Sequence, residues 1–296
     1  MLTPTNITAL LWPGIRQVYG DAYMQFEEQY SKVFDIDTSD KYKEIDQGYT
    51  GLGLASEKPV GQSINYDTTY QGYEKTYTNA TYAIGVAIGR ETLEDTLYRN
   101  IKNTARSQAV SVRQTIEVLA VSHLNNAFSS SYAGSDSKEL CATDHPLVGG
   151  GTFSNELATS ADLDPTSLEQ ALIDIQAFVD DRSLKVHARP KLLIIPSALE
   201  WTAIQLLKSE KLPQTANNDV NPAKGIMPYV VMNWLSDSDA WFIKTDVPYG
   251  LTWFWRRRPE YREDNNFDAE VAKFKATFRC SSGWTDPRGL FGSPGG

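Results

Sequence analysis

The stretch Gln62–Ile88, QSINYDTTYQGYEKTYTNATYAIGVAI, decides how the rest of this chain is interpreted. It is rich in tyrosine but poor in aliphatic residues until its last third. Its second half alternates, with Tyr82, Ile84 and Val86 on one face, which is the period-two pattern of a β-strand. We therefore predict a long two-stranded projection whose base joins a core. An isolated hairpin is marginal in water, so we expect a second copy of the chain to supply the surface that stabilises it.

Tyrosine is favoured at protein interfaces because an apolar ring carries a polar hydroxyl. We expect the basic run at 256–258 to be a solvated strand end or to pair with carboxylates across an interface. The predicted contacts between subunits are made by Tyr66, Tyr70, Tyr73, Tyr77, Lys58, Arg256 and Arg257. Two alternatives stay open: the tyrosines could line a glycan-binding face, and the basic run could meet DNA.

Composition sets outer bounds on the function. The chain has 296 residues, 41% hydrophobic and 22% charged, and a net charge of −9, which indicates one large or two modest folded domains. An acidic chain is a poor general binder of nucleic acid. No apolar stretch is long enough for a transmembrane helix, and the N-terminus lacks a secretory signal. Cys141 and Cys280 predict a reducing compartment without a disulfide framework, although one bridge between them stays open.

The hydrophobic period changes after the tyrosine-rich stretch. Apolar residues recur every three or four positions from Arg90 to about Phe128 without Gly or Pro, which predicts one helix about 55 Å long. Asp164-Pro165 begins a second helix, and Ser197 with Glu200 forms a capping box for a third. Strands are expected at Lys191–Ile195, Tyr229–Trp234, Ala240–Lys244, Leu251–Arg256 and Val271–Cys280. The fold class is therefore α+β.

The two ends of the chain carry weaker patterns. Near the start, Pro13 precedes a short helix expected within Gly14–Tyr30, in an arm with little core of its own. Near the end, Glu263–Asn266 is interpreted as a polar break between strands. The last residues, GSPGG, are expected to be a flexible tail.

Few residues suggest catalysis or metal binding. Asp144-His145 is the one pair that could act as an acid–base couple, with Cys141 close in sequence, but no nucleophile motif accompanies it. The pair is better explained as part of a turn before Pro146. No metal-binding motif is present, and Gly149–Gly151 lacks the ending of a phosphate-binding loop. We expect no enzyme activity and no catalytic, cofactor-binding or metal-ligating residues.

Three segments resemble a known family. They are Ala142–Pro146 followed by Gly149–Gly151 and Ser154-Asn155; Arg189–Pro196 with Leu199-Glu200 beyond; and Trp234-Leu235 with Asp239–Phe242. Together with the order of the elements, they resemble the major capsid proteins of tailed phages, specifically the Mu-type major head subunit. The resemblance covers roughly residues 14–285.

This resemblance implies the tailed-phage capsid fold, an α+β fold with an N-terminal arm, an extended β-hairpin loop, a peripheral domain on a spine helix and an axial α/β domain. The implied divisions are an arm at 1–47, an extended β loop at 48–89, the peripheral domain at 90–161, the axial domain at 162–259, and a return strand with a flexible tail at 260–296. The loop 48–89 would lie over a neighbouring subunit, and Leu212–Pro228 would face the capsomer axis. No covalent crosslink through Lys58 or Lys75 is predicted.

The implied function is a self-assembling major capsid protein that forms hexamers and pentamers of an icosahedral shell around double-stranded DNA. Its implied partners are other copies of itself, a separate scaffolding protein, a portal and a decoration protein, with DNA bound only non-specifically and no membrane. The implied location is the virion capsid, assembled in the cytoplasm of a bacterial host. The alternatives are another phage structural or adhesin-like glycan-binding protein, and a hydrolase using Asp144 and His145.

Overall fold

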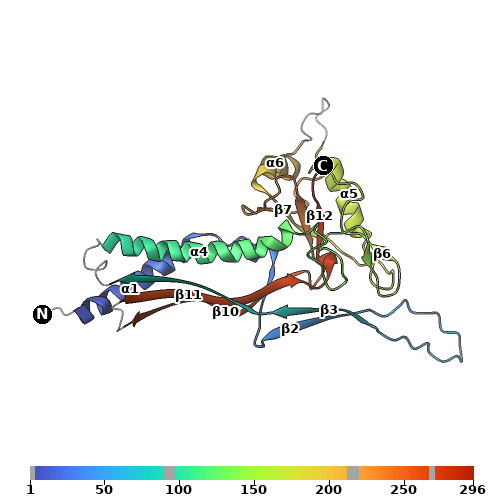
Figure 1. The fold of residues 1–296 in the computed structure, drawn as a ribbon. Helices are drawn as coiled ribbons and strands as arrows, with labels where there is room; N and C mark the ends of the chain where they lie inside the picture. The colour runs from blue at the N-terminus through green and yellow to red at the C-terminus, as the bar shows by residue number, and fades with distance from the viewer. Residues whose placement is uncertain (1–3, 90–97, 212–219, 267–270) are drawn as a thin grey trace.

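The computed structural model describes residues 4–89, 98–211, 220–266 and 271–296. Figure 1 shows an elongated body in which long helices lie along long strands, a lobe that rises at one end of the body, and a narrow loop that projects beyond it. The expected start of the spine helix at 90–97 lies outside the described residues, as does 212–219 of the loop expected at the capsomer axis.

The elements of the body come from both ends of the chain. Its helices are α1 (Pro4–Gln25), α2 (Tyr30–Val33) and α4 (Tyr98–Asn125). Its strands are β1 (Asp35–Thr38), β2 (Lys43–Tyr49), β3 (Gln71–Thr78), β4 (Ala80–Gly89), β10 (Leu251–Asn266) and β11 (Val271–Trp284). Strands β2 and β3 form a separate antiparallel pair.

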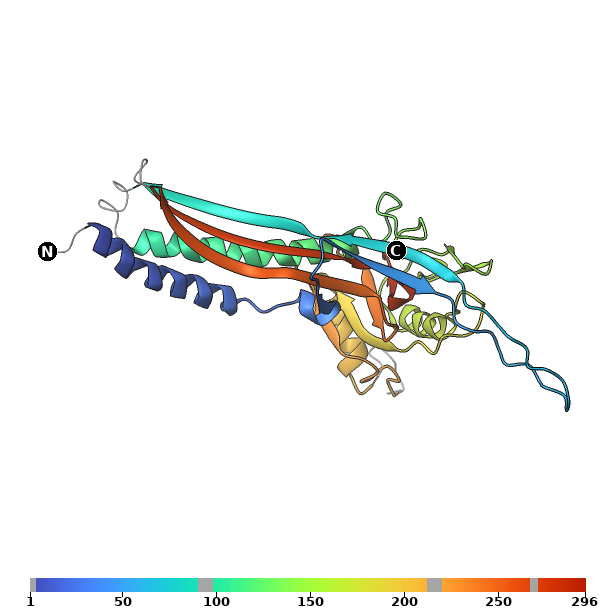
Figure 2. The same cartoon turned by 90° about the horizontal axis from the view of Figure 1, so that it is seen from below.

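The long sheet of the body has the strand order β1-β10-β11-β4. Strand β1 is parallel to β10, and the other pairs are antiparallel. The alternation expected for Val271–Cys280 is confirmed: Phe274, Ala276 and Phe278 are buried, whereas Lys273 and Lys275 are exposed. The buried row faces α4 and α1. On the opposite face, Figure 2 shows no helix, and Tyr77 of β3 covers Phe254 of β10 at one end. The sheet therefore has one face packed on helices and an opposite face that β3 covers at one end.

The lobe is a compact α/β unit. Its sheet has the order β12-β9-β7-β8 and consists of β7 (Pro190–Ile195), β8 (Tyr229–Val231), β9 (Trp241–Thr245) and β12 (Leu290–Ser293). Helices α5 (Pro165–Gln176) and α6 (Glu200–Lys208) pack on it, and a short pair, β5 (His145–Pro146) with β6 (Thr152–Phe153), lies nearby. The 3₁₀ turns are Ser197–Leu199 and Pro287–Gly289.

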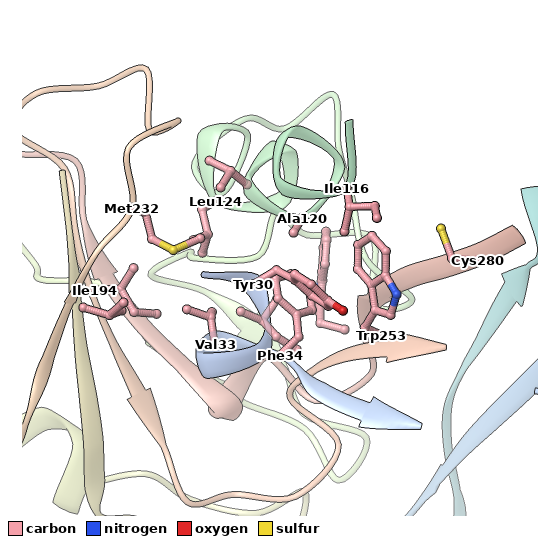
Figure 3. Close-up of a cluster of buried hydrophobic side chains, with 14 of the residues drawn as sticks. Tyr30, Val33, Phe34, Ile116, Ala120, Leu124, Ile194, Met232, Trp253 and Cys280 are labelled. Carbon is pink, nitrogen blue, oxygen red and sulfur yellow. The ribbon is translucent and has the colours of Figure 1, made fainter. Parts of the chain in front are cut away.

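One core joins the arm, the body and the lobe. Figure 3 shows Tyr30 and Phe34 of the arm against Ile116 of α4 and Trp253 of β10, with Ile194 of the lobe close by. All of these side chains are almost completely buried. The arm thus contributes to a shared core instead of forming its own.

A buried carboxylate fixes the arm to α4. Glu117 accepts hydrogen bonds from the backbone N–H groups of Gln29 and Tyr30, both at 2.9 Å, at the start of α2. Arg113, one turn earlier on α4, pairs with Glu28 at 2.6 Å. Burial raises the pKa of Glu117. The carboxylate supplies the N-terminal cap that the sequence of α2 lacks, since Gln29 makes no side-chain cap.

Several expectations about helices need correction. The helix expected at Gly14–Tyr30 is instead α1, which begins at Pro4, contains Pro13 within its length and ends at Gln25. The spine helix α4 ends at Asn125, before Phe128. Asp164 caps α5 as expected. The capping box at Ser197 and Glu200 is wrong, because Ser197 lies in a 3₁₀ turn, Glu200 is the first residue of α6 and no side chain caps α6.

The domain limit at 259, the strand break at 263–266 and the tail also need correction. Residues 251–259 belong to β10 of the long sheet and not to the axial lobe, and β10 continues through the expected polar break to Asn266. The C-terminus is not a flexible tail, because β12 pairs with β9 and Phe291 is fully buried. A side chain at Gly292 would lie 2.8 Å from Cys141 Sγ, so close packing explains the glycine.

Candidate assembly surfaces

The segment between β2 and β3 is the most exposed part of the described chain. Every residue from 52 to 71 is exposed, and Figure 1 shows the loop reaching away from the body. It presents apolar side chains to solvent, among them Leu54 at 84%, Val60 at 106% and Tyr66 at 87% exposure. Exposed apolar side chains concentrated in one projecting segment are typical of an interaction surface.

The base of this loop is held to its own subunit. Asp67 accepts a hydrogen bond from the Gly53 N–H at 2.7 Å and pairs with Arg182 of the lobe at 2.5 Å. Arg182 also donates to the Thr68 carbonyl and lies over the Tyr70 ring. The Gly53 N–H, and then Arg182, lower the pKa of Asp67. These contacts fix the direction of the loop and leave its tip free.

The predicted tyrosines fall into different environments. Tyr66 and Tyr70 are exposed, as is Lys58, and Tyr73 is half-buried at the loop base. Tyr77 was expected to contact another subunit, and that expectation is wrong. Its side chain is buried, its hydroxyl lies 2.6 Å from Thr285 Oγ1, its ring packs on Phe254, and burial raises its pKa. Tyr77 instead anchors β3 to the body.

The basic run does not form one patch. Arg256 donates to the Ser39 carbonyl and pairs with Asp40 at 3.3 Å, both within the same chain. Arg257 donates to Thr277 Oγ1 at 3.2 Å, and Arg258 lies over the Trp255 ring. Register shifts between Trp255 and Glu260 turn these side chains in different directions. The run lies in the long sheet, away from the loop tip (Figure 1).

Two features of the loop were missed from sequence. Arg182, which clamps the loop base, lies 115 positions from Asp67, and nothing in the local pattern links them. Leu54, Val60 and Ile64 were not predicted as contact residues, because the glycine and proline residues around them indicate turns. Their spacing within an otherwise polar, extended segment is the signal that could have found them.

The Asp144-His145 pair is not a couple in the structure. His145 is fully buried, with Nδ1 at 2.6 Å from Asp136 Oδ2 and Nε2 at 3.0 Å from Asn155 Oδ1. Asp144 pairs with Lys138 at 2.5 Å. Asn155 continues the network by donating to three backbone carbonyls, those of Leu140, Pro287 and Leu290. These contacts join the ATDHP turn, the SN turn and the C-terminal segment, so the geometry is that of a structural network.

The remaining chemistry is sparse. Cys141 and Cys280 are both free and buried, and burial raises the pKa of each thiol. Within the described residues, no group of three or more His, Cys, Asp or Glu side chains is placed to hold a metal ion. No helix in the same residues is long and apolar enough to cross a membrane.

Solved structures with the same fold are shell proteins. The chain has a TM-score of 0.52 to the procapsid of bacteriophage JBD30, at 16% identity over 99% of this chain and 76% of the other. It has a TM-score of 0.55 to the capsid of Ralstonia phage GP4, at 12% identity over 86% and 83%. The virus-like particle of Pyrococcus furiosus gives 0.53, at 11% identity over 94% and 97%.

The fold is therefore that of capsid subunits, a class of structural proteins that build closed shells. A family model described as phage capsid protein matches residues 72–292, which is more than half of the chain. The chain belongs to this phage capsid protein family and is a capsid shell protein. No curated protein matches its sequence.

Proposed function

We propose that the chain is the major head subunit of a tailed phage, forming hexameric and pentameric capsomers of an icosahedral shell around double-stranded DNA. The observation that carries the proposal is the loop at 52–71, which is exposed along its whole length and bears apolar side chains. Such a loop gains stability only when another molecule covers it. Head-to-tail contacts between a projecting loop and a different surface of the next copy close into rings.

The finer assignments are part of the same proposal. Similarity of the ATDHP, GGG and RPKLLIIP segments to the Mu-type head subunit supports that subtype. The partners would be other copies of the chain, a separate scaffolding protein, a portal and a decoration protein, with assembly in the cytoplasm of a bacterial host. The contact residues would include Tyr66, Tyr70, Tyr73, Lys58, Arg256 and Arg257.

A structural role without catalysis is proposed as well. It is supported by the separate partners of Asp144 and His145 and by the structural role of the capsid family. Family membership also favours the shell over the glycan-binding alternative, since no geometry on the loop selects a sugar.

The test is assembly of a loop-tip variant. Leu54→Ser, Val60→Ser and Tyr66→Ser combined should leave a folded subunit that forms no shells, because these side chains are almost wholly exposed in their own chain. Negative-stain microscopy and sedimentation velocity measure assembly, and circular dichroism measures folding. The matched control is Val118→Ser with Tyr132→Ser, two other exposed apolar positions. Normal shells from the loop variant would contradict the proposal.

A further inference from the structure

A groove separates α1 from the second half of β10. Its volume is about 870 Å³, and Figure 2 shows the helix and the strand alongside one another. The apolar part of its lining comes from Tyr19, Tyr23, Met24, Trp255 and Tyr261. Met24 is 79% exposed, and methionine is an adaptable contact residue at surfaces that bind varied peptides.

One wall of the groove is an open strand edge. Strand β1 pairs with β10 only at Thr252–Trp255. At Arg257 and from Glu260 to Glu263, β10 pairs with β11 on one side, and no other described residue makes a backbone hydrogen bond to the outer edge of these residues. Tyr261 and Arg262 point to opposite faces of the strand, yet both line the groove. The groove therefore runs along the edge itself.

Unpartnered polar groups line the same groove. Tyr19 is 6% exposed, and its hydroxyl and that of Tyr261 have no hydrogen-bond partner among the described residues. Buried hydroxyls normally have one. Burial raises the pKa of both tyrosines, that of Tyr19 to about 12, so both hydroxyls stay protonated at neutral pH.

The charges at the rim are also incomplete. Arg16 pairs with Glu263 and Arg262 pairs with Glu260. Arg258 has no carboxylate within ion-pair distance among the described residues and lies over the Trp255 ring. An arginine that has no carboxylate partner and lies over an aromatic ring favours an incoming carboxylate.

We propose that this strand–helix groove binds an extended, acidic segment of another protein, which adds as a strand to the open edge of β10. Backbone hydrogen bonds to the edge provide affinity, as in other cases of strand addition between a helix and a sheet edge. Alternate apolar side chains pack on Tyr23 and Met24, and a carboxylate pairs with Arg258. This binding is separate from shell formation and is measured on its own.

The loop of a second copy fits this groove less well. Between residues 52 and 70 the loop carries Glu57, Lys58 and Asp67, and Asp67 is already paired with Arg182. The charges of the remaining residues, Glu57 and Lys58, cancel, so the loop offers no net negative charge to Arg258. Charge complementarity therefore assigns the groove to a different protein.

Peptide binding to the full chain tests the proposal. The probe is a fluorescein-labelled peptide of four Leu-Glu repeats, whose period of two separates apolar from acidic side chains, and fluorescence anisotropy follows binding. Saturable binding is expected, together with no binding of the matching Leu-Lys peptide. Methylation of alternate backbone nitrogens should abolish binding in one register and spare it in the other, which is the signature of strand addition.

A matched pair of variants locates the site. Arg258→Glu should weaken binding at least roughly tenfold, while Arg257→Glu should change it less than about twofold, because Arg257 donates to Thr277 and does not line the groove. The proposal would be overturned if the two variants weakened peptide binding equally, or if methylation of the peptide backbone left binding unchanged in both registers. Tighter binding of a peptide spanning 52–70 than of the acidic probe would assign the groove to a second copy and overturn the choice of partner.

Discussion

The body and the projecting loop both carry large apolar side chains, which are buried in the body and exposed in the loop. In the body, large apolar side chains such as Trp253 and Phe278 are buried between α4 and the long sheet. In the loop, Leu54 and Val60 lie in solvent. Burial within the chain stabilises the body, whereas apolar side chains in the loop contribute only when another molecule covers them. The apolar side chains that stabilise the fold and those that stay exposed therefore lie in different parts of the molecule.

The largest effect is expected from a matched pair of tryptophan substitutions. Trp253→Ala should lower the free energy of unfolding by about 3–5 kcal/mol, because it leaves a cavity among Tyr30, Phe34 and Trp255. Trp201→Ala, at a side chain that is 77% exposed, should change it by less than about 0.5 kcal/mol. Urea unfolding followed by circular dichroism measures both. Similar losses in the two variants would remove the distinction between core and surface.

The next effect concerns pH. Burial lowers the pKa of His123 from 6.5 to about 4, with a smaller contribution from Lys75. The unfolded chain therefore binds this proton at a higher pH than the folded chain, so the contribution of His123 is complete above pH 6.5 and is lost as the pH falls towards 4. The loss amounts to about 3 kcal/mol.

His123→Gln should remove that part of the acid sensitivity, and the exposed His187→Gln should not. Unfolding free energies measured at pH 7, 5.5 and 4.5 give the comparison. A slope with pH that is the same in the two variants would show that His123 is not the residue responsible.

A smaller effect should follow from loosening the loop base. Arg182→Ala removes the contacts to Asp67, Thr68 and the Tyr70 ring, and Arg182 is not a member of a hydrophobic core cluster. Amide hydrogen exchange at residues 53–70 should become faster while exchange in α4 is unchanged, because only the loop anchor is lost. Arg189→Ala, a nearby arginine that does not contact the loop, is the control. Unchanged exchange in the loop would mean that the Thr50–Tyr70 hydrogen bonds are sufficient.

The smallest effect on stability is expected at the loop tip. Leu54→Ser and Val60→Ser should each change the unfolding free energy by less than about 0.5 kcal/mol, since neither side chain is covered. Their effect on shell formation should nonetheless be large. A marked loss of stability in the isolated subunit would show that the loop packs on its own chain.

Local periodicity predicted much of the fold. The alternation at Val271–Cys280, the cap at Asp164 and the long amphipathic helix all depend on residues close in sequence, and the structure contains each of them. Predictions failed where contacts with distant segments decide whether a side chain is buried or exposed. Tyr77 belongs to the same tyrosine-rich stretch as Tyr66 and Tyr73, but it is buried. The end of β11 and Thr285, more than 200 positions away in the sequence, pack against it.

Two further predictions that were based on composition were wrong. The GSPGG end looked flexible, yet Gly292 is a glycine because Cys141 and Phe242 leave no space for a side chain. The polar stretch at 263–266 looked like a break, yet Glu263 pairs with Arg16 of α1 and β10 continues. In both cases a partner from a distant segment gives polar or small residues a regular structure.

The sequence by itself determined the class of fold, the long helix and the alternating return strand, because each follows from the order of apolar and polar residues along a short stretch. Only the tertiary structure decided which tyrosines are exposed, where β10 ends, how Arg182 and Glu117 hold the loop and the arm, and that an open strand edge lies beside α1. Those outcomes depend on which distant segments cover a given face. The order of residues in a short stretch does not specify those segments.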